Sequence, residues 1–174
     1  MAAEIKKILF PTDLTQHAQY AFKFAVSLAD RYGATIAILH VMEDLPVNVE
    51  AQLAGFLGDE KWTNQKKEHE KDARETLIGK KRDGMMIRHA LHSFCQDMKD
   101  GDPECNFTTD EIVVKSGNVV QEIIEQAETS NADLIVMAYY SRNMLAEAMM
   151  GGVTRRVLRR SKRPVLLVPM PESL

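Results

Sequence analysis

The chain is poor in cysteine and has no long hydrophobic run, and each absence excludes a class of protein. Two cysteines in 174 residues, Cys95 and Cys105, are too few for the disulfide framework of a small secreted domain. No apolar stretch approaches the roughly 20 residues that cross a bilayer. The apolar residues 8–10 are followed at once by Pro11, so no signal-peptide core opens the chain. We therefore expect a cytoplasmic protein with no membrane partner, in which the two cysteines are free thiols, either buried or redox-sensitive, and not a disulfide.

A large excess of charge of one sign is also lacking. The net charge of −3 is too small to indicate a nucleic-acid partner. One local exception is a run of cations within residues 155–163, which we expect to coat the solvent-facing end of a helix, where cations suit the helix dipole. The alternative is an anion or partner site. With 45% apolar and 27% charged residues, the composition is that of a globular domain with a core of its own.

The chain is organised around residues 132–168. An apolar run at 134–138 is followed by a polar turn, the pair Gly151 and Gly152, a helical pattern at 153–160 and a second apolar run at 164–168. Short apolar runs of this kind indicate buried parallel strands, and strand–helix–strand predicts a right-handed crossover. Because ligands in such sheets bind beyond the carboxyl ends of the strands, we expect the functional site at the loop 138–152.

The same alternation runs through the rest of the chain. Further strands are expected at 7–11, 35–42 and 110–115. Helices are expected at 15–32, beginning at an N-cap Thr15 and ending at Gly33, at 47–56, at 61–82, at 85–98 after an interruption at Gly84, and at 119–130. The pattern predicts an α/β fold in one domain over residues 1–174, with a five-stranded parallel sheet and helices on both faces.

Sequence motifs for other chemistry are weak. His89, His92 and Cys95 follow one another at helical spacing, but a metal needs further ligands, and histidines exposed beside an apolar stripe explain the pattern more simply. The chain contains no G-x4-G-K-[S/T] loop and no recognisable order of serine, histidine and aspartate.

Four stretches resemble the universal stress protein family. They are KILFPTDLT at residues 7–15, LHV at 39–41, the stretch from VKSGNVV to DLIVMA at 114–138, and GGVTRRVLRRSKRPVLLV at 151–168. The resemblance implies a Rossmann-like sheet of the adenine-nucleotide alpha-hydrolase type, and a homodimer formed through the last strand, which begins at Pro164 and ends at Val168. Residues 59–106 match no motif of the family. They predict a helical insertion between strands two and three.

Many members of that family bind ATP through the motif G-x2-G-x9-G-[S/T]. Its four positions fall on Ala138, Ser141, Gly151 and Gly152, so the third glycine alone is kept. Glycines there let backbone amides approach the phosphates. The pair of glycines still offers free N–H groups at a helix N-terminus, and Arg142 adds a positive charge. The alternative is that the two glycines merely allow the helix to pack closely on the sheet.

The half of the pocket that faces the base and ribose is better preserved. Asp13 matches the position that faces the adenosine, although it would also serve as an N-cap. Val41 matches the position whose backbone meets the adenine, although a buried strand end also explains it. The resemblance therefore places an adenine-nucleotide site, with Mg²⁺ present only if ATP binds, on Pro11, Thr12, Asp13, Val41, Ala138, Ser141, Arg142, Gly151, Gly152 and Val153.

Three functions are compatible with these residues. The leading hypothesis is a stress-response regulatory or binding protein with a degenerate nucleotide-binding cleft. The second is an ATP-binding protein with weak ATPase or phosphotransfer activity, against which stands the lack of a residue placed as general base. The third is an interaction protein whose partner binds the insertion at 59–106, through its charged helix, Met85, Met86 and Phe94.

Overall fold

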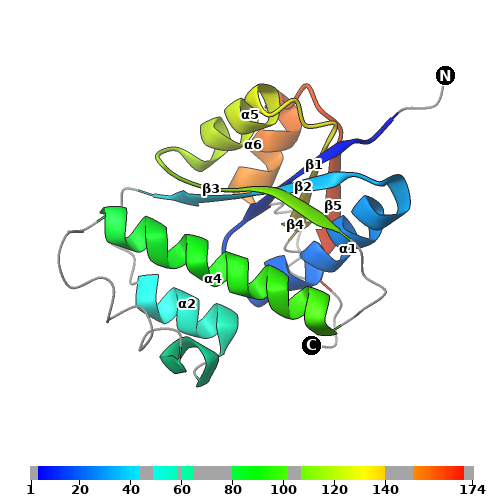
Figure 1. The fold of residues 1–174 in the computed structure, drawn as a ribbon. Coiled ribbons are helices and arrows are strands. Elements are labelled where there is room, and N and C mark those ends of the chain that lie inside the picture. The colour runs from blue at the N-terminus through cyan, green and yellow to red at the C-terminus, as the bar shows by residue number, and fades with distance from the viewer. Residues whose placement is uncertain are drawn as a thin grey trace.

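The computed structural model describes residues 4–43, 49–58, 60–64, 80–101, 107–139 and 151–170. Five parallel strands form one sheet in the order β3-β2-β1-β4-β5 (Figure 1). The strands are β1 Lys7–Thr12, β2 Thr35–Met42, β3 Thr108–Ser116, β4 Leu134–Tyr139 and β5 Val165–Pro169. The five-stranded parallel sheet expected from the alternating pattern is confirmed, with strand ends that differ by one or two residues.

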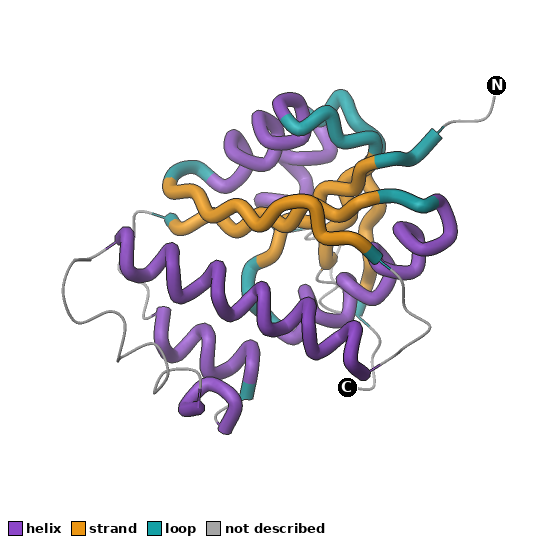
Figure 2. Tube along the Cα trace, in the orientation of Figure 1, coloured by secondary structure: helices purple, strands orange, loops and turns teal. Residues whose placement is uncertain are grey.

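Helices cover both faces of this sheet, as predicted. One face carries α1, α2 and α4 and the other carries α5 and α6 (Figures 1 and 2). The helices are α1 Gln16–Tyr32, α2 Val49–Leu57, α4 Lys80–Gly101, α5 Val119–Thr129 and α6 Gly152–Arg160, and residues 60–64 form a further short helix. None of the helices in these described ranges is long and apolar enough to cross a membrane.

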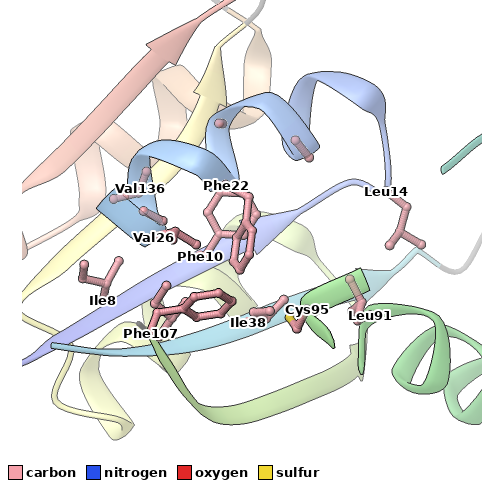
Figure 3. Packing of buried hydrophobic residues seen from close by; sticks show 14 of the residues in the cluster. Ile8, Phe10, Leu14, Phe22, Val26, Ile38, Leu91, Cys95, Phe107 and Val136 are labelled. Carbon is pink, nitrogen blue, oxygen red and sulfur yellow. The ribbon is translucent and has the colours of Figure 1, made fainter. Parts of the chain in front are cut away.

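The larger of the two cores lies between the sheet and α1, α2 and α4. Its centre is Phe22 of α1, whose ring lies 5.0 Å from that of Phe10, 5.4 Å from that of Phe94 and 5.7 Å from that of Phe107, measured between centroids (Figure 3). The smaller core packs alternate residues of the strands, such as Leu9 and Ile135, against α5 and α6. Burial on both faces explains why the strands read as continuous apolar runs.

The first helix begins and ends where the sequence predicts. The side chain of Thr15 accepts a hydrogen bond from the backbone N–H of Ala18, and Gly33 adopts a left-handed conformation (φ +64°) at the C-terminus. A hydroxyl at the N-cap and glycine after the last turn are what these two positions require. The bounds of α1 are therefore set by local chemistry at both ends.

The interruption expected at Gly84 is wrong, because α4 runs without a break from Lys80. A side chain at position 84 would lie against the sheet, with its Cβ 3.6 Å from the Met42 side chain and 3.7 Å from that of Val114. A glycine inside a helix costs about 1 kcal/mol relative to alanine. Here that cost is offset by burial of the neighbouring apolar residues Ile87 and Leu91.

The apolar surface expected on residues 59–106 is smaller than predicted. Met85 is exposed, but Phe94 packs inward, with its ring 5.0 Å from that of Phe56. The helix expected at 61–82 falls mostly on residues 65–79, which lie outside the described residues, as do residues 59 and 102–106. Of the described parts of this segment, α4 covers β3 and contributes to the larger core, and the short helix at 60–64 adds Trp62 to the same core.

Candidate functional site

The strand order places a topological switch point between β1 and β4, and we call the region beyond the carboxyl ends of these two strands the crevice. The chain passes from β1 toward β2 and β3 on one side and from β4 toward β5 on the other, so the order reverses between β1 and β4. Within the described residues these two strands are paired at Ile8 with Leu134 and at Leu9 with Ile135, and not beyond. Their carboxyl-terminal halves are therefore unpaired with one another. Ligands of open α/β sheets bind at such a switch point.

A compact polar turn follows β1 at the edge of this crevice. The Oγ1 atom of the buried Thr12 accepts a hydrogen bond from the N–H of Leu14 at 3.1 Å. The Oδ1 atom of the exposed Asp13 accepts from the N–H of Thr15 at 3.1 Å and from its hydroxyl at 2.6 Å. Asp13 is thus not the N-cap of α1, which corrects one of its two interpretations. It fixes the orientation of Thr15, which is the cap.

Two side chains from other elements bind the backbone of the same turn. The imidazole of His40 in β2 donates through Nδ1 to the carbonyl oxygen of Thr12 at 2.9 Å. The amide of Gln52 in α2 donates to the carbonyl oxygen of Asp13, also at 2.9 Å. Sequence reasoning missed both residues. A histidine near the end of the apolar strand TIAILHVM was a usable signal for a buried hydrogen bond, but no pattern in the sequence marked Gln52.

Burial controls the charge of His40. Removal from water lowers the pKa of the imidazole, while its hydrogen bond to Thr12 and the negative charge of Asp13 oppose that shift. A neutral ring that donates through Nδ1 carries its lone pair on Nε2. The end of β2 therefore contributes a donor and no positive charge to this part of the site at neutral pH.

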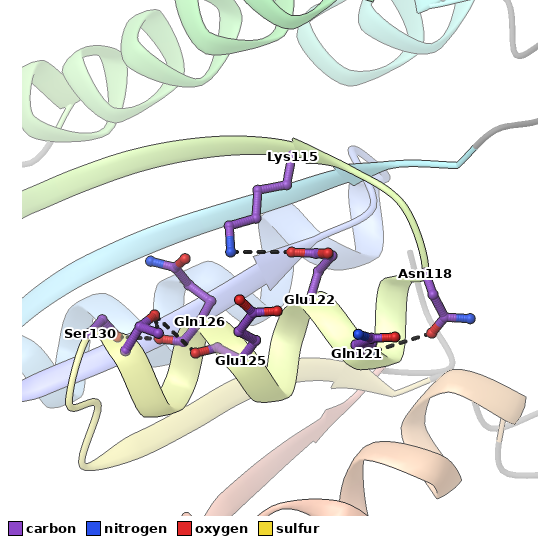
Figure 4. A network of polar contacts seen from close by, with 8 residues as sticks. Lys115, Asn118, Gln121, Glu122, Glu125, Gln126 and Ser130 are labelled. Atoms are coloured by element: carbon purple, nitrogen blue, oxygen red, sulfur yellow. Dashed lines mark hydrogen bonds and ion pairs between the residues drawn. The ribbon is translucent and has the colours of Figure 1, made fainter.

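The adjacent ends of β2 and β3 are also joined. The N–H of Gly117, which has φ +144°, donates to the carbonyl of Met42 at 3.0 Å. Lys115 lies opposite Val41 in the strand register, and its Nζ is 3.2 Å from Oε2 of Glu122 in α5 (Figure 4). Val41 itself is buried in the smaller core. Packing alone therefore explains a valine at position 41, as the interpretation of Val41 as a buried strand end requires. Contact with an adenine stays a prediction.

The opposite wall is formed by the end of β4 and the beginning of α6. Ala138 is half-buried beside the larger core, and Val153 packs against the smaller one. Ser141 and Arg142 lie outside the described residues. The first turn of α6 begins at the exposed Gly151 and Gly152, and backbone N–H groups at a helix N-terminus attract anions.

Close packing on the sheet does not explain these two glycines. Among the described residues, a Cβ on Gly151 would approach no atom closer than Oγ1 of Thr154, at 4.0 Å. A Cβ on Gly152 would lie 3.5 Å from the guanidinium of Arg156, whose Nε donates to the carbonyl of Gly152 at 2.9 Å. Both neighbours belong to α6 itself. Among the described residues, no contact with the sheet requires a glycine at position 151 or 152, and the anion site at this helix N-terminus stays a prediction.

The histidine and cysteine series on α4 does not form a cluster. His89 and His92 are exposed, whereas Cys95 is buried against the larger core. No group of three side chains suited to a metal occurs in the ranges that the structure describes. Burial raises the pKa of the Cys95 thiol to about 11, so it is uncharged at neutral pH. Cys105 lies outside the described residues.

The lowered pKa of His40 predicts a loss of stability in mild acid. Above the ordinary pKa of 6.5 the imidazole is neutral in both states. As the pH falls below 6.5, the unfolded chain takes up a proton that the folded protein resists, so the free energy of unfolding decreases, by at most about 1.4 kcal/mol per pH unit. In His40→Asn, the amide keeps a donor for the carbonyl of Thr12 and does not titrate.

Urea unfolding between pH 7.5 and 5 should show a steeper decrease in the free energy of unfolding for the wild type than for His40→Asn. Parallel curves would contradict the assignment.

Comparison with known proteins agrees with this architecture. Residues 4–169 match the model of the universal stress protein family. Universal stress protein MJ0577 of Methanocaldococcus jannaschii is 25% identical over 99% of this chain and 100% of its own, and Universal stress protein MJ0531 of the same organism is 26% identical over 97% and 84%.

Solved structures show the same fold. The structure of MJ0577 has a TM-score of 0.59 at 22% identity, covering 97% of this chain and 99% of its own. The universal stress protein UspA from Lactobacillus plantarum has the same score and identity over 96% and 99%. A universal stress protein crystallised in complex with cAMP has a TM-score of 0.55 at 17% identity, over 97% and 99%. Because the family model spans nearly the whole length, the chain belongs to the universal stress protein family.

Proposed function

We propose that this protein binds an adenine nucleotide in the crevice between β1 and β4, and that it acts in the cytoplasm as a regulatory stress-response protein. The observation that carries the proposal is the switch point between β1 and β4, where the Asp13 turn follows β1 and the first turn of α6 follows β4 along the chain. The cAMP complex of a structural neighbour supports an adenine nucleotide as the ligand class.

The β1 side of the crevice fits the nucleoside. Asp13 is exposed at the strand end, and a carboxylate offers about four lone-pair sites, of which Thr15 takes two. The remaining sites suit ribose hydroxyls, which are donors. Pro11 and Thr12 precede this carboxylate in β1, and Val41 follows His40 at the end of the neighbouring strand. These residues supply shape and backbone groups for the base.

The α6 side is the weaker half of the proposed site. Gly151 and Gly152 present N–H groups to a phosphate, but Gly152 lacks the hydroxyl of the family motif and Ala138 replaces its first glycine. We propose that this degenerate half binds phosphate groups with little discrimination between mono- and triphosphates. Mg²⁺ belongs to the proposal only in company with ATP.

Substitution of Asp13 tests the nucleoside half. Asp13→Ala should weaken AMP and ATP binding by about tenfold or more, since a hydrogen bond to a charged group contributes about 1.5–3 kcal/mol. Asp13→Asn, which can still accept from Thr15, should lose less. Asp30→Ala, at the far end of α1, is the matched control. Calorimetry on nucleotide-stripped protein measures the affinity of each variant for AMP and ATP. An affinity that Asp13→Ala leaves unchanged removes Asp13 from the site, and no binding by the wild type up to millimolar nucleotide overturns the proposed function.

Restoring the missing hydroxyl tests the phosphate half. Gly152→Ser should tighten ATP binding several-fold by adding one hydrogen bond to a phosphate oxygen. The space for it exists, because the added Cβ makes only an ordinary contact with Arg156 at 3.5 Å. Gly152→Ala adds the same Cβ without the hydroxyl and is the control. Equal affinities of the two variants for ATP would show that position 152 does not face the phosphates.

We also propose a homodimer formed through β5. This strand is an edge of the sheet and pairs with β4 alone among the described strands. Leu166 on β5 leaves 36% of its surface exposed. An apolar edge strand without a partner is prone to aggregate, so a second copy of the chain is the expected cover.

A charge on the edge strand tests the dimer. Leu166→Lys should shift the protein from dimer to monomer, because pairing would bury an unpaired charge. Met85→Lys places the same side chain at an exposed apolar position on α4, over the opposite part of the sheet, and should leave the dimer intact. Sedimentation velocity at micromolar concentration measures both. A wild-type protein that sediments as a monomer contradicts the proposal.

A further inference from the structure

The turn after β1 has a strained conformation that depends on contacts from outside the strand. Leu14 has a left-handed backbone (φ +59°) although it is not glycine, and its side chain is buried. Such a conformation is unfavourable for a residue with a Cβ and persists only where surrounding groups determine it. The surrounding groups here are His40 and Gln52, which bind two consecutive carbonyl oxygens, those of Thr12 and Asp13.

These two contacts come from different layers of the molecule. His40 belongs to β2 and is paired with Thr12, the last residue of β1, so its position is fixed by the sheet. Gln52 belongs to α2, a nine-residue helix outside the sheet. Movement of α2 therefore changes the contact to the Asp13 carbonyl, while the contact to the Thr12 carbonyl stays.

The packing of α2 shows how it is held in place. Leu53 and Phe56 are buried against α1 and α4, and the amide of Gln19 in α1 donates to the carbonyl of Phe56. Beside these contacts lies a cavity of about 10 Å³, lined in part by Thr12, Gln19 and Phe56. A space of that size holds about one water molecule and no ligand. Helix α2 is thus packed on α1 and α4 next to the turn. A small void lies near Phe56 of α2 and Thr12 of the turn.

We propose that Gln52 is a positioning residue, which links α2 to the turn that carries Asp13, so that docking of α2 and binding of a ligand in the crevice are coupled. The Asp13 carbonyl and the Asp13 carboxylate belong to one residue, so fixing the peptide group directs the side chain. The coupling to ligand binding rests on the nucleotide site proposed above. The link between Gln52 and the turn is independent of that site. Because coupling is reciprocal, a ligand on Asp13 must also stabilise the docked position of α2.

Amide hydrogen exchange measured by NMR tests the link without any ligand. The N–H groups of Leu14 and Thr15 bond to Thr12 Oγ1 and Asp13 Oδ1, so their exchange rates report on the turn directly. Gln52→Glu is isosteric and removes the donor, and should raise both rates by about 3- to 10-fold, the effect of one partly exposed hydrogen bond. Gln52→Lys restores a donor of similar reach and should return the rates toward the wild type.

The control is a glutamine of the same kind elsewhere. Gln96 in α4 donates through its amide to Asp100 at 3.1 Å, so Gln96→Glu makes the same chemical change away from the turn and should leave both rates unchanged. Unchanged rates in Gln52→Glu would overturn the proposal. So would equal rates in Gln52→Glu and Gln52→Lys, since packing and not donation would then be responsible.

Saturating AMP tests the coupling. AMP should slow amide exchange within α2 in the wild type, and should slow it much less in Gln52→Glu. The affinity of Gln52→Glu for AMP should fall by about 3- to 10-fold, the factor expected for the exchange rates. A merely structural role for Gln52 would not make the protection of α2 depend on the ligand. If AMP binds and α2 is not protected, the coupling is wrong. If the wild type binds no AMP, the nucleotide proposal fails, and the exchange rates of Leu14 and Thr15 still decide the role of Gln52.

Discussion

The hydrogen-bonded turn from Thr12 to Thr15 is the constraint on which the rest of the crevice depends. Within four residues it ends β1, reverses the backbone through a left-handed Leu14 and begins α1 at its cap. Each polar side chain in it accepts a hydrogen bond from a backbone N–H two or three residues further on, so part of the turn's stability is local to the sequence TDLT and the start of α1. The contacts from β2 and α2 then set its position relative to the sheet.

The two walls of the crevice differ in how they are built. Beyond β1, hydrogen bonds from neighbouring elements hold the backbone of the turn, and Thr15 orients the exposed carboxylate of Asp13. At α6, the glycines of the helix N-terminus have no side-chain neighbour outside their own helix among the described residues. The turn after β1 is therefore the preorganised part of the described site, and preorganisation is what reduces the cost of binding.

The elements of the fold could be predicted from the sequence because short apolar runs and capping residues are local signals. The strand TIAILHVM has the bounds that its pattern gives, and Thr15 and Gly33 bound α1 as expected. The interruption expected at Gly84 was wrong because burial of Ile87 and Leu91 stabilises the helix through that position, and only the tertiary packing reveals this. The partners of His40 and Gln52 are backbone carbonyls 28 and 39 residues away, so the sequence could mark His40 as a polar group in an apolar strand but could identify neither partner.

The burial of Cys95 bears on how a protein of this family responds to stress. Peroxides react with the thiolate form of cysteine, and a pKa of about 11 leaves roughly one thiol in ten thousand ionised at pH 7. The side chain is also enclosed between α4 and the sheet, where an oxidant has no access. Cys95 therefore acts as a core residue and is a poor oxidant sensor.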